Sequence, residues 1–309
     1  MKKRVTYVGN FGPRFSTEND ISWTFQDMGW EVAEAQENVC DSQHILKAAL
    51  DSDLLLWTST HGWQVPGIPM EIVLQTLHEH QIPTAAIHLD RYVGLNINDQ
   101  REDRIGVAPW WKCQYVFTAD GGNQERFAER GVNHVWSPPA IAKRHCKLGR
   151  PRPEFTADVC YVGAKHYHPE YPFRTQLVNW LDGPHKWTFK RWGGGDRPSV
   201  REELSDVYAS CKIVVGDSCF AGASCYWSDR CPEVMGRGGF LLHPWSVGMT
   251  FEGMGTYLPQ NIQSLDGRIN RYLNNLGERE MMRVEGFEWV KAHETYHNRV
   301  EKMLEVIFG

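Results

Sequence analysis

The feature that most constrains the fold is an alternation of short apolar strands with amphipathic helices along almost the whole chain. In the first half, the apolar runs that predict strands are Val5–Val8, Leu54–Thr58, Thr84–Leu89 and Tyr115–Thr118. Strands that are joined by helices pair in parallel, because each helix carries the chain back to the edge where the previous strand began. The sequence therefore predicts an α/β fold in which parallel sheets have helices on both faces.

Polar residues and a proline mark where the helices of the first half should begin and end. Thr17 and Asp20 have the spacing of a capping box ahead of an apolar helical face, and Ser42 precedes a second such face. A third helix should run over about 70–80 and stop before Pro83. These helices would supply the crossovers between the parallel strands.

The alternation stops between Ser137 and Pro153, where the chain carries four prolines and the basic run KRHCKLGRPR. It then restarts, and the predicted elements are strands at Asp158–Val162, Lys186–Trp192, Lys212–Val215 and Phe240–Leu242, helices at Tyr171–Trp180 and after a Ser199/Glu202 capping box, and a long last helix over roughly 279–307. We expect two doubly wound, Rossmann-like domains, residues 1–150 and 151–285. A C-terminal helix, 286–309, should pack back toward the first domain.

The composition excludes several classes of protein. Hydrophobic residues make up 41% of the chain, charged residues 23%, and no apolar run is long enough to span a membrane. The first ten residues, MKKRVTYVGN, predict a β-strand and not a signal peptide, so we expect a cytoplasmic protein without a membrane partner. The net charge of −5 gives no overall basic surface for nucleic acid, but the run from Lys143 to Arg152 leaves a local one open.

Signatures of bound metal and of dinucleotide cofactors are missing. The eight cysteines should be free thiols in a cytosolic chain, and Cys219, Cys225 and Cys231 lack the paired spacing of zinc ligands. The glycine-rich loop after the first strand, GNFGPRF, is not GxGxxG and lacks the Lys-Ser/Thr of a P-loop. We therefore expect no metal and no nicotinamide cofactor.

One match to a zinc motif remains, HETYH at His293–His297. It fits the HExxH pattern, in which two histidines share one face of a helix and hold zinc in metallopeptidases. Such a site needs a third ligand, and the short segment after His297 offers only Glu301 on the same helical stripe. A zinc metallopeptidase acting through His293 and His297 is therefore a minor alternative to a polar helix face.

Acid–base candidates follow three strands of the first half. His61, Asp90 and Asp120 each come directly after or close to a predicted strand end. Because the carboxyl ends of parallel strands share one edge, a general base that deprotonates an acceptor hydroxyl could stand there. The competing interpretation is that each residue only caps a helix or stabilises a turn.

Cations and glycines follow the strands of the second half. Gly163 and Lys165 come after the strand at 158–162, and Arg191 and Gly193 lie at the end of the next strand. Backbone N–H groups and positive side chains at such an edge could neutralise a diphosphate. The alternative for each charged residue is solvated surface charge.

The segment Arg230–His243, RCPEVMGRGGFLLH, combines a short helix, two glycines and an apolar strand. Arg230 and Glu233 fall in the first turn of the helix, where backbone N–H groups and the helix dipole favour a phosphorylated ligand. Gly238 and Gly239 close the turn before the strand. Taken alone, the segment could equally be an ordinary turn with a glycine cap.

This segment resembles the R-x-x-E…G-G-F-L pattern of CgeB-type glycosyltransferases, which have the GT-B fold of two Rossmann-like domains facing a cleft. The resemblance covers about 156–308 and includes the DVCYVG strand, the RWG turn, the NRYLNN helix and the closing HETYHNR segment. The family pattern gives a second explanation for the HExxH match.

The resemblance implies a hexosyltransferase-like enzyme that moves a sugar from a UDP-linked donor to an acceptor hydroxyl. The first domain would then be the acceptor side, and the second would bind the nucleotide sugar. Glu233 would bond the nucleotide ribose and Arg230 would lie near the diphosphate. Many retaining GT-B enzymes carry two glutamates, E-x7-E, with the second at the position of Glu233. Cys225 stands where the first would be, which leaves the sugar contact unassigned. By the same resemblance, transfer would need no metal and no cofactor other than the donor.

The acceptor has several candidates. The basic run and Lys186–Arg197, KWTFKRWGGGDR, could follow a phosphate backbone, with tryptophans for stacking. Related phage enzymes modify hydroxymethylated bases in DNA, which would have to be extruded into the cleft. A glycan or a small molecule would also provide a hydroxyl. A non-catalytic module that binds nucleotides or glycans is the alternative of a different class.

Overall fold

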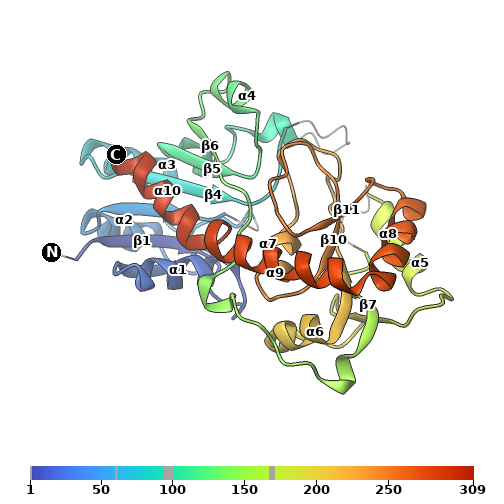
Figure 1. The fold of residues 1–309 in the computed structure, drawn as a ribbon. Coiled ribbons are helices and arrows are strands. Elements are labelled where there is room, and N and C mark those ends of the chain that lie inside the picture. Colours follow the sequence, from blue (N-terminus) through green and yellow to red (C-terminus); the bar gives the residue numbers. More distant parts are fainter. Residues whose placement is uncertain (1, 60–61, 94–100, 167–170) are drawn as a thin grey trace. The chain divides into compact units, whose positions relative to one another are not determined.

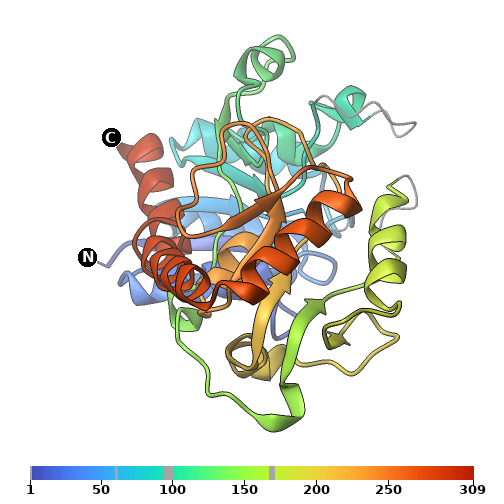
Figure 2. The same ribbon diagram turned by 45° about the vertical axis from the view of Figure 1, so that its right-hand side comes forward.

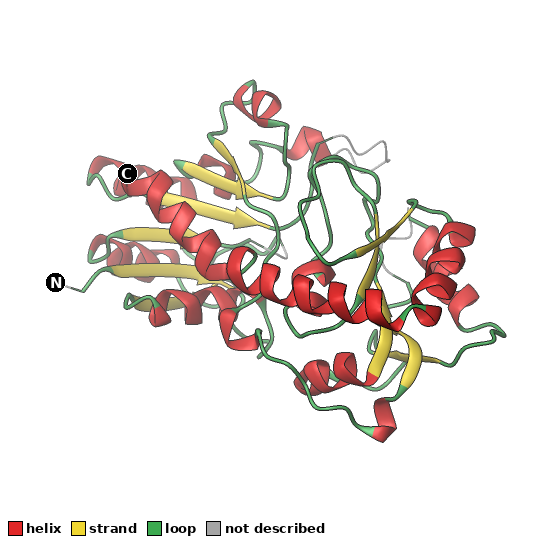
Figure 3. Ribbon diagram, viewed as in Figure 1, coloured by secondary structure: helices red, strands yellow, loops and turns green. Residues whose placement is uncertain are grey.

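A computed structural model describes residues 2–59, 62–93, 101–166 and 171–309 of the chain (Figure 1). The chain divides into two compact units, and Figure 3 shows that each has its own sheet with helices around it. Unit 1 comprises Met1–Pro138 together with Tyr296–Gly309, and unit 2 comprises Pro139–Thr295. The sequence placed the domain boundary at 150/151, within the same proline-containing connection.

Unit 1 is built on a six-stranded parallel sheet with the order β2-β1-β3-β4-β5-β6. Its described strands are β1 (Arg4–Gly9), β2 (Glu31–Gln36), β3 (Leu54–Trp57), β4 (Thr84–His88), β5 (Tyr115–Thr118) and β6 (His134–Trp136). Its described helices are α1 (Thr17–Asp27), α2 (Ser42–Leu50), α3 (Met70–Glu79), α4 (Gln124–Ala128) and α10 (Tyr296–Phe308), with short 3₁₀ turns at Arg101–Arg104 and Pro109–Lys112. The parallel sheet follows from the strand–helix alternation and confirms that expectation.

The last helix, α10, packs against α1 in unit 1. Its buried residues, Tyr296, Val300 and Met303, recur at helical spacing and form one apolar face. At the start of the same helix, His297 Nε2 lies 2.8 Å from Asp27 Oδ2, at the end of α1. This polar contact and the apolar face together attach the C-terminal segment to the unit.

Unit 2 is built on a five-stranded parallel sheet with the order β11-β10-β9-β7-β8. Its described strands are β7 (Ala157–Val162), β8 (Phe189–Trp192), β9 (Cys211–Val215), β10 (Leu241–Pro244) and β11 (Gly255–Tyr257). Its described helices are α5 (Phe173–Leu181), α6 (Leu204–Ser210), α7 (Arg230–Met235), α8 (Ile262–Asn274) and α9 (Leu276–His293), with 3₁₀ turns at Lys143–His145, Pro153–Phe155 and Arg201–Glu203.

One face of this sheet carries the main core of unit 2. Val159 and Tyr161 of β7 and Ile213 and Val215 of β9 pack there with residues of α5 and α8. Figure 2 shows α5 and α8 on the same side of the sheet. Alternate residues of each strand point to this face, because successive side chains of a strand project to opposite sides.

The helix predicted over 279–307 is wrong as a single helix. α9 ends at His293 and α10 begins at Tyr296. Between them the Glu294 carbonyl accepts a hydrogen bond from the Ile141 N–H at 3.1 Å, and Thr295 forms an isolated parallel bridge with Ile141. The break removes the premise of the HExxH interpretation, because the two histidines are not on one helical face.

Other predicted boundaries shift by one or a few residues. The N-cap of α1 is Ser16 and that of α2 is Asp41, each one residue before the predicted cap. The predicted cap at Ser199 and Glu202 is wrong, because the 3₁₀ turn Arg201–Glu203 precedes α6. The N-cap of that turn is Val200 and the N-cap of α6 is Glu203, and neither has a side-chain cap bond. Within the described residues, no helix is long and apolar enough to cross a membrane.

Candidate functional site

The carboxyl ends of four strands of unit 2 are aligned at one edge of its sheet. Val162 of β7 pairs with Trp192 of β8, and Val215 of β9 pairs with Leu242 of β10. The residues that follow these strands therefore come together, as the sequence predicted for Gly163 and Gly193. This edge is where ligands bind in doubly wound folds.

The Arg230 guanidinium lies across this edge. Its nitrogens donate to the carbonyls of Val162 and Asp217, to Ser228 Oγ and to Tyr161 OH, each at 3.4 Å. Its Cζ is 5.3 Å from the centre of the Tyr161 ring. Because these hydrogen bonds are at the long limit for N–H···O geometry, the guanidinium is held in place but only weakly bonded. It could exchange these partners for a stronger acceptor such as a phosphate oxygen.

Glycines bring backbone close to this guanidinium. Gly163 has φ +139°, and a Cβ there would come within 2.4 Å of Arg230 Nη2. Gly193 and Gly194 also have positive φ, and a Cβ at Gly194 would come within 2.5 Å of Ala164 Cα. The β7 and β8 loops therefore pack tightly because they lack side chains at these positions. Lys165, in the first of these loops, is half-buried, and its carbonyl accepts from Thr175 Oγ1 at 3.4 Å.

A buried ion pair supports the same edge. Arg174 of α5 donates from Nε to Asp217 Oδ2 at 2.9 Å, and the two side chains are 6% and 2% exposed. Asp217 follows β9 by two residues, so the pair ties α5 to the loop at the end of that strand. A charge-assisted bond between two buried groups fixes the direction of the carboxylate.

Three buried polar atoms in β10 or just after β9 have no hydrogen-bond partner among the described residues. They are Asp217 Oδ1, Ser218 Oγ and His243 Nε2. A Cβ at Gly216 would lie 3.1 Å from His243 Cδ2, so the imidazole is beside the residue that precedes Asp217. Buried polar groups are normally satisfied, which makes this group a candidate for ligand or water contact.

Asp217 and His243 are not among the site residues predicted from the sequence. Asp217 has the same sequence feature as Asp90 and Asp120, because it is a polar residue that follows an apolar strand, in IVVGDS. His243 lies inside β10. The sequence does not indicate that a histidine in a strand is buried or that one of its ring nitrogens has no hydrogen-bond partner.

The guanidinium of Arg191 is engaged within its own loop. Nη1 and Nη2 donate to the two carboxylate oxygens of Asp196 at 2.9 and 2.6 Å, and the side chain is 3% exposed. Hydrogen bonding and charge from Asp196 raise the Arg191 pKa, and the bond to Arg191 lowers the Asp196 pKa. Arg191 thus shapes the loop that carries Gly193–Gly195.

Glu233 lies in α7, one turn after Arg230. Its Oε2 accepts from Arg237 Nε and Nη2, both at 3.0 Å, in an i,i+4 pair whose side chains are 26% and 9% exposed. As predicted from the sequence, Arg230 and Glu233 lie in one short helix. The pairing with Arg237 is an addition from the structure.

Gly238 and Gly239 lie at the other edge of the sheet. They precede β10 and therefore sit at the amino ends of the parallel strands. Gly238 has φ +75°, and a Cβ at Gly239 would come within 2.7 Å of Val234 Cγ1. The two glycines allow the chain to turn tightly from α7 into β10, and the structure does not bring them to Arg230.

In unit 1, Asp120 is fully buried and accepts several hydrogen bonds. The N–H groups of Tyr92 and Val93 donate to its carboxylate at 2.8–3.1 Å, and Thr118 Oγ1 donates at 2.8 Å. Burial raises the Asp120 pKa, while these hydrogen bonds oppose the rise. The carboxylate holds the turn after β4, which is the capping alternative that the sequence left open.

Asp90 is more accessible, and it also follows β4. Its side chain is 45% exposed, and Oδ2 lies 3.4 Å from Arg101 Nη1. Its N–H donates to His88 Nδ1 at 3.2 Å, and burial lowers the His88 pKa, which favours the neutral ring that accepts this bond. The remaining candidate base, His61, lies outside the described residues.

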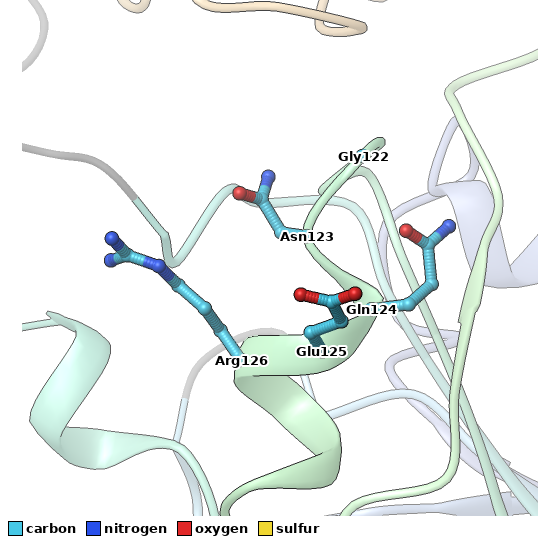
Figure 4. Close-up of a pocket in the computed structure, with 5 residues that line it drawn as sticks. All are labelled: Gly122, Asn123, Gln124, Glu125 and Arg126. Carbon is cyan, nitrogen blue, oxygen red and sulfur yellow. The ribbon is translucent and has the colours of Figure 1, made fainter.

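A surface pocket of unit 1 is lined by Gly122–Arg126 at the start of α4, as Figure 4 shows. Arg126 Nη1 is 3.0 Å from both carboxylate oxygens of Glu102. Across 2–59, 62–93, 101–166 and 171–309, no three His, Cys, Asp or Glu side chains are grouped so that they could hold a metal ion.

The aromatic residues of Lys186–Arg197 are packed within unit 2. Trp187 stacks on His185 with ring centres 3.8 Å apart, and Trp192 is buried against Phe155. The cations of the basic run are more accessible, since Lys143, Arg144, Lys147 and Arg150 are exposed. These cations could contribute to electrostatic attraction of a polyanion.

The sequence and the fold are similar to those of known proteins. Residues 174–305 match a family described as glycosyl transferase-like. The structure is similar to that of Anabaena HepE solved with UDP, with a TM-score of 0.65 and 11% identity over 99% of this chain and 100% of that one. None of the curated proteins matches the sequence.

Two further structures are similar over the whole chain. An α-glucosyltransferase solved with UDP and a 13-mer DNA containing an HMU base gives a TM-score of 0.63 at 9% identity, covering 100% of both chains. Sucrose-phosphate synthase from Thermosynechococcus elongatus gives 0.64 at 9% identity, covering 99% of both. Structural similarity at 9–11% sequence identity shows the fold alone. The chain has the α/β GT-B architecture.

Proposed function

We propose that the protein is a glycosyltransferase that moves a sugar from a UDP-sugar to an acceptor hydroxyl. The observation that carries the proposal is the placement of Arg230, whose guanidinium lies across the carboxyl ends of β7 and β9 beside Gly163. The glycosyl transferase-like match over 174–305 contains this residue, and proteins of similar structure have been solved with UDP or UDP-glucose.

Arg230 would stabilise the leaving diphosphate. When the bond between the sugar and the diphosphate breaks, negative charge develops on the phosphate oxygen that leaves. A guanidinium fixed at that position stabilises this charge without reorganisation, which is the main electrostatic requirement of the reaction. The N–H groups of Gly163 and Gly193 themselves donate to the carbonyls of Trp192 and Pro198. Lys165 and the N–H groups that follow these glycines in the two loops would add donors around the same phosphates. This arrangement supports transfer without a metal ion.

Glu233 would accept hydrogen bonds from the hydroxyls of the nucleotide ribose. It lies one helical turn after Arg230, and its carboxylate is partly exposed. Arg237 donates to the carboxylate at 3.0 Å and fixes its position. An ionised, oriented carboxylate is a strong acceptor for a pair of hydroxyls.

The acceptor hydroxyl would lose its proton to a group of unit 1. Asp90 is the candidate that we favour, because its carboxylate is partly exposed and beside a strand end, whereas that of Asp120 is buried under backbone N–H groups. His61 remains a second candidate. In either case the base must reach the acceptor within hydrogen-bond distance.

For the acceptor we propose a hydroxymethylated base in DNA. One protein of similar structure has been solved with DNA that contains an HMU base, and the exposed cations between Lys143 and Arg150 could contact phosphates. The target base would have to leave the duplex stack to reach an enclosed site. A glycan acceptor would need no such cations.

The experiment is a transfer assay with a panel of UDP-sugars against duplexes with hydroxymethylated bases, plain duplexes and soluble glycans. Transfer to hydroxymethylated DNA alone, abolished in Arg230→Gln, supports the proposal in full. Transfer to a glycan would replace DNA as acceptor. UDP binding without transfer from any donor would identify a non-catalytic module. The matched control is Arg271→Gln, which removes an exposed arginine paired with Glu278.

A further inference from the structure

Two unpartnered atoms near Arg230, Asp217 Oδ1 and His243 Nε2, are hydrogen-bond acceptors and cannot bind phosphate. Asp217 Oδ2 is taken by Arg174 at 2.9 Å, which leaves Oδ1 of the carboxylate without a partner among the described residues. His243 Nδ1 faces the Pro244 carbonyl at 2.8 Å and must therefore donate its hydrogen there, so Nε2 of the neutral ring is an acceptor. A phosphate carries negative charge and few hydrogens to donate, so it would be repelled by the carboxylate.

Burial makes these acceptors costly to leave unsatisfied. Asp217 and His243 are each 1% exposed. Burial lowers the His243 pKa to about 4, so the ring stays neutral and Nε2 stays available near neutral pH. A buried acceptor without a hydrogen bond costs about 1–3 kcal/mol, which a donor from a ligand or a buried water would recover.

The position of the two acceptors selects which part of a nucleotide sugar they meet. Arg230 Nη1 donates to the backbone carbonyl of Asp217, so this residue lies directly beside the proposed diphosphate position. The groups bonded directly to a diphosphate are the ribose and the transferred sugar, and the nucleobase is one unit farther away. Glu233 is the proposed ribose ligand, which leaves the sugar for Asp217 and His243.

We propose that Asp217 Oδ1 and His243 Nε2 form the subsite that accepts hydrogen bonds from hydroxyls of the transferred sugar. This inference rests on the proposed function and assigns a contact that the sequence left open at Cys225. Arg174 is the positioning residue, because its bond to Oδ2 fixes the carboxylate and leaves Oδ1 for the ligand. Ser218 Oγ, which is also buried without a partner among the described residues, lies next to the subsite and could donate or accept.

The test compares UDP with UDP-sugars, because only the sugar distinguishes the two ligands. Binding of UDP, UDP-glucose, UDP-galactose and UDP-N-acetylglucosamine is measured by calorimetry for the wild type, Asp217→Asn and His243→Asn. Loss of a hydrogen bond to a charged acceptor corresponds to roughly a 10- to 100-fold loss of affinity. We expect this loss in Asp217→Asn for the preferred UDP-sugar and an unchanged affinity for UDP.

His243 provides a variant that does not disturb the ion pair. In His243→Asn the amide can still donate to the Pro244 carbonyl, but the acceptor at the Nε2 position is lost. His243→Gln places a carbonyl oxygen near that position and should restore most of the UDP-sugar affinity. A thermal melt of each variant confirms that it is folded.

Three results would overturn the subsite. Equal losses of UDP and UDP-sugar affinity would show that the residues contact the nucleotide or maintain the fold. Unchanged affinity for every ligand would show that water satisfies the two atoms. Loss in His243→Gln equal to that in His243→Asn would show that the ring is needed for packing. Failure of the wild type to bind UDP at all would instead reject the proposed function itself.

Discussion

Arg174 and Asp217 form an ion pair, 2.9 Å between Nε and Oδ2, in which both side chains are almost completely buried. The pair joins α5 to the loop after β9. In that loop the Asp217 carbonyl accepts from Arg230 of the proposed donor site. Removing charges from water is costly, so such a pair adds little net stability over apolar residues, but breaking it leaves a buried charge without compensation. Its value here is that it fixes the Asp217 carboxylate in one direction.

The first prediction is that Arg174→Met destabilises the fold strongly. It leaves the Asp217 carboxylate buried and unpaired, and such a change typically costs about 3–5 kcal/mol. Urea unfolding followed by tryptophan fluorescence measures the loss. Arg271→Met is the control, because Arg271 is exposed and pairs with Glu278 at the surface, where ion pairs contribute little to stability. Similar losses in the two variants would contradict the role given to burial.

A second prediction separates Asp90 from Asp120. Asp120→Ala removes the acceptor for the Tyr92 and Val93 N–H groups and should lower the free energy of unfolding by about 1–3 kcal/mol per buried donor left unsatisfied. Asp90→Asn should leave the melting temperature unchanged and lower kcat by about 10²–10⁴, the range for loss of a general base. A stable Asp120→Ala protein together with a fully active Asp90→Asn enzyme would reverse the assignment.

The third prediction concerns Glu233 and its partner. Glu233→Ala should weaken UDP binding by roughly tenfold, which corresponds to about 1.4 kcal/mol. Arg237→Met breaks the same ion pair but keeps the carboxylate, so UDP affinity should fall less than in Glu233→Ala. Calorimetric titration of both variants with UDP measures the two losses of affinity. If the two losses are equal, the pair stabilises α7 and Glu233 does not contact the ribose.

The sequence predicted the elements whose hydrophobic pattern is strong. β3 and β5 are fully or almost fully buried apolar runs, so their strand character and position were clear. β2, EVAEAQ, was missed because it is an edge strand with a largely exposed or half-buried surface and few apolar residues. The three-residue strand β11 is too short to give a pattern.

The candidate site was predictable where it depends on strand ends. Gly163, Gly193 and Arg230 meet at one edge because parallel strands align their carboxyl ends, and that rule can be applied to a sequence. The role of Asp120 could not be predicted, since its donors come from residues 27 and 28 positions away. The engagement of Arg191 by Asp196 depends on side-chain geometry in a glycine loop, which spacing alone does not define.

The fourth prediction is a pH dependence of stability that arises from His134. Its Nε2 is 2.9 Å from Thr118 Oγ1, and Thr118 donates its hydrogen to Asp120, so Nε2 must donate and Nδ1 would receive an added proton. Nδ1 is buried without a partner among the described residues, and burial lowers the pKa to about 4.

The sign of the effect follows from proton binding. The unfolded chain, with an ordinary histidine pKa of about 6.5, binds more protons than the folded one between about pH 6.5 and 4. The free energy of unfolding should therefore fall as the pH drops through this window, by up to about 3 kcal/mol from this residue. His134→Gln should flatten that slope in urea unfolding measured from pH 7 to 4. An identical slope in wild type and variant would exclude His134 as its source.

The last prediction uses the contact between Gly163 and Arg230. In Gly163→Ala the new Cβ would lie 2.4 Å from Arg230 Nη2, so the guanidinium must move off the strand edge. If Arg230 binds the diphosphate from its present position, UDP affinity should fall by roughly tenfold or more, the effect of losing one charge-assisted contact.

Gly195→Ala is the matched control. It also places a side chain at a positive φ, +84°, but its Cβ meets nothing within 4 Å. Because both variants carry a backbone cost, a drop in melting temperature is expected in each, and only Gly163→Ala should lose UDP binding. Equal UDP affinity in the two variants would mean that the position of the Arg230 guanidinium does not control donor binding.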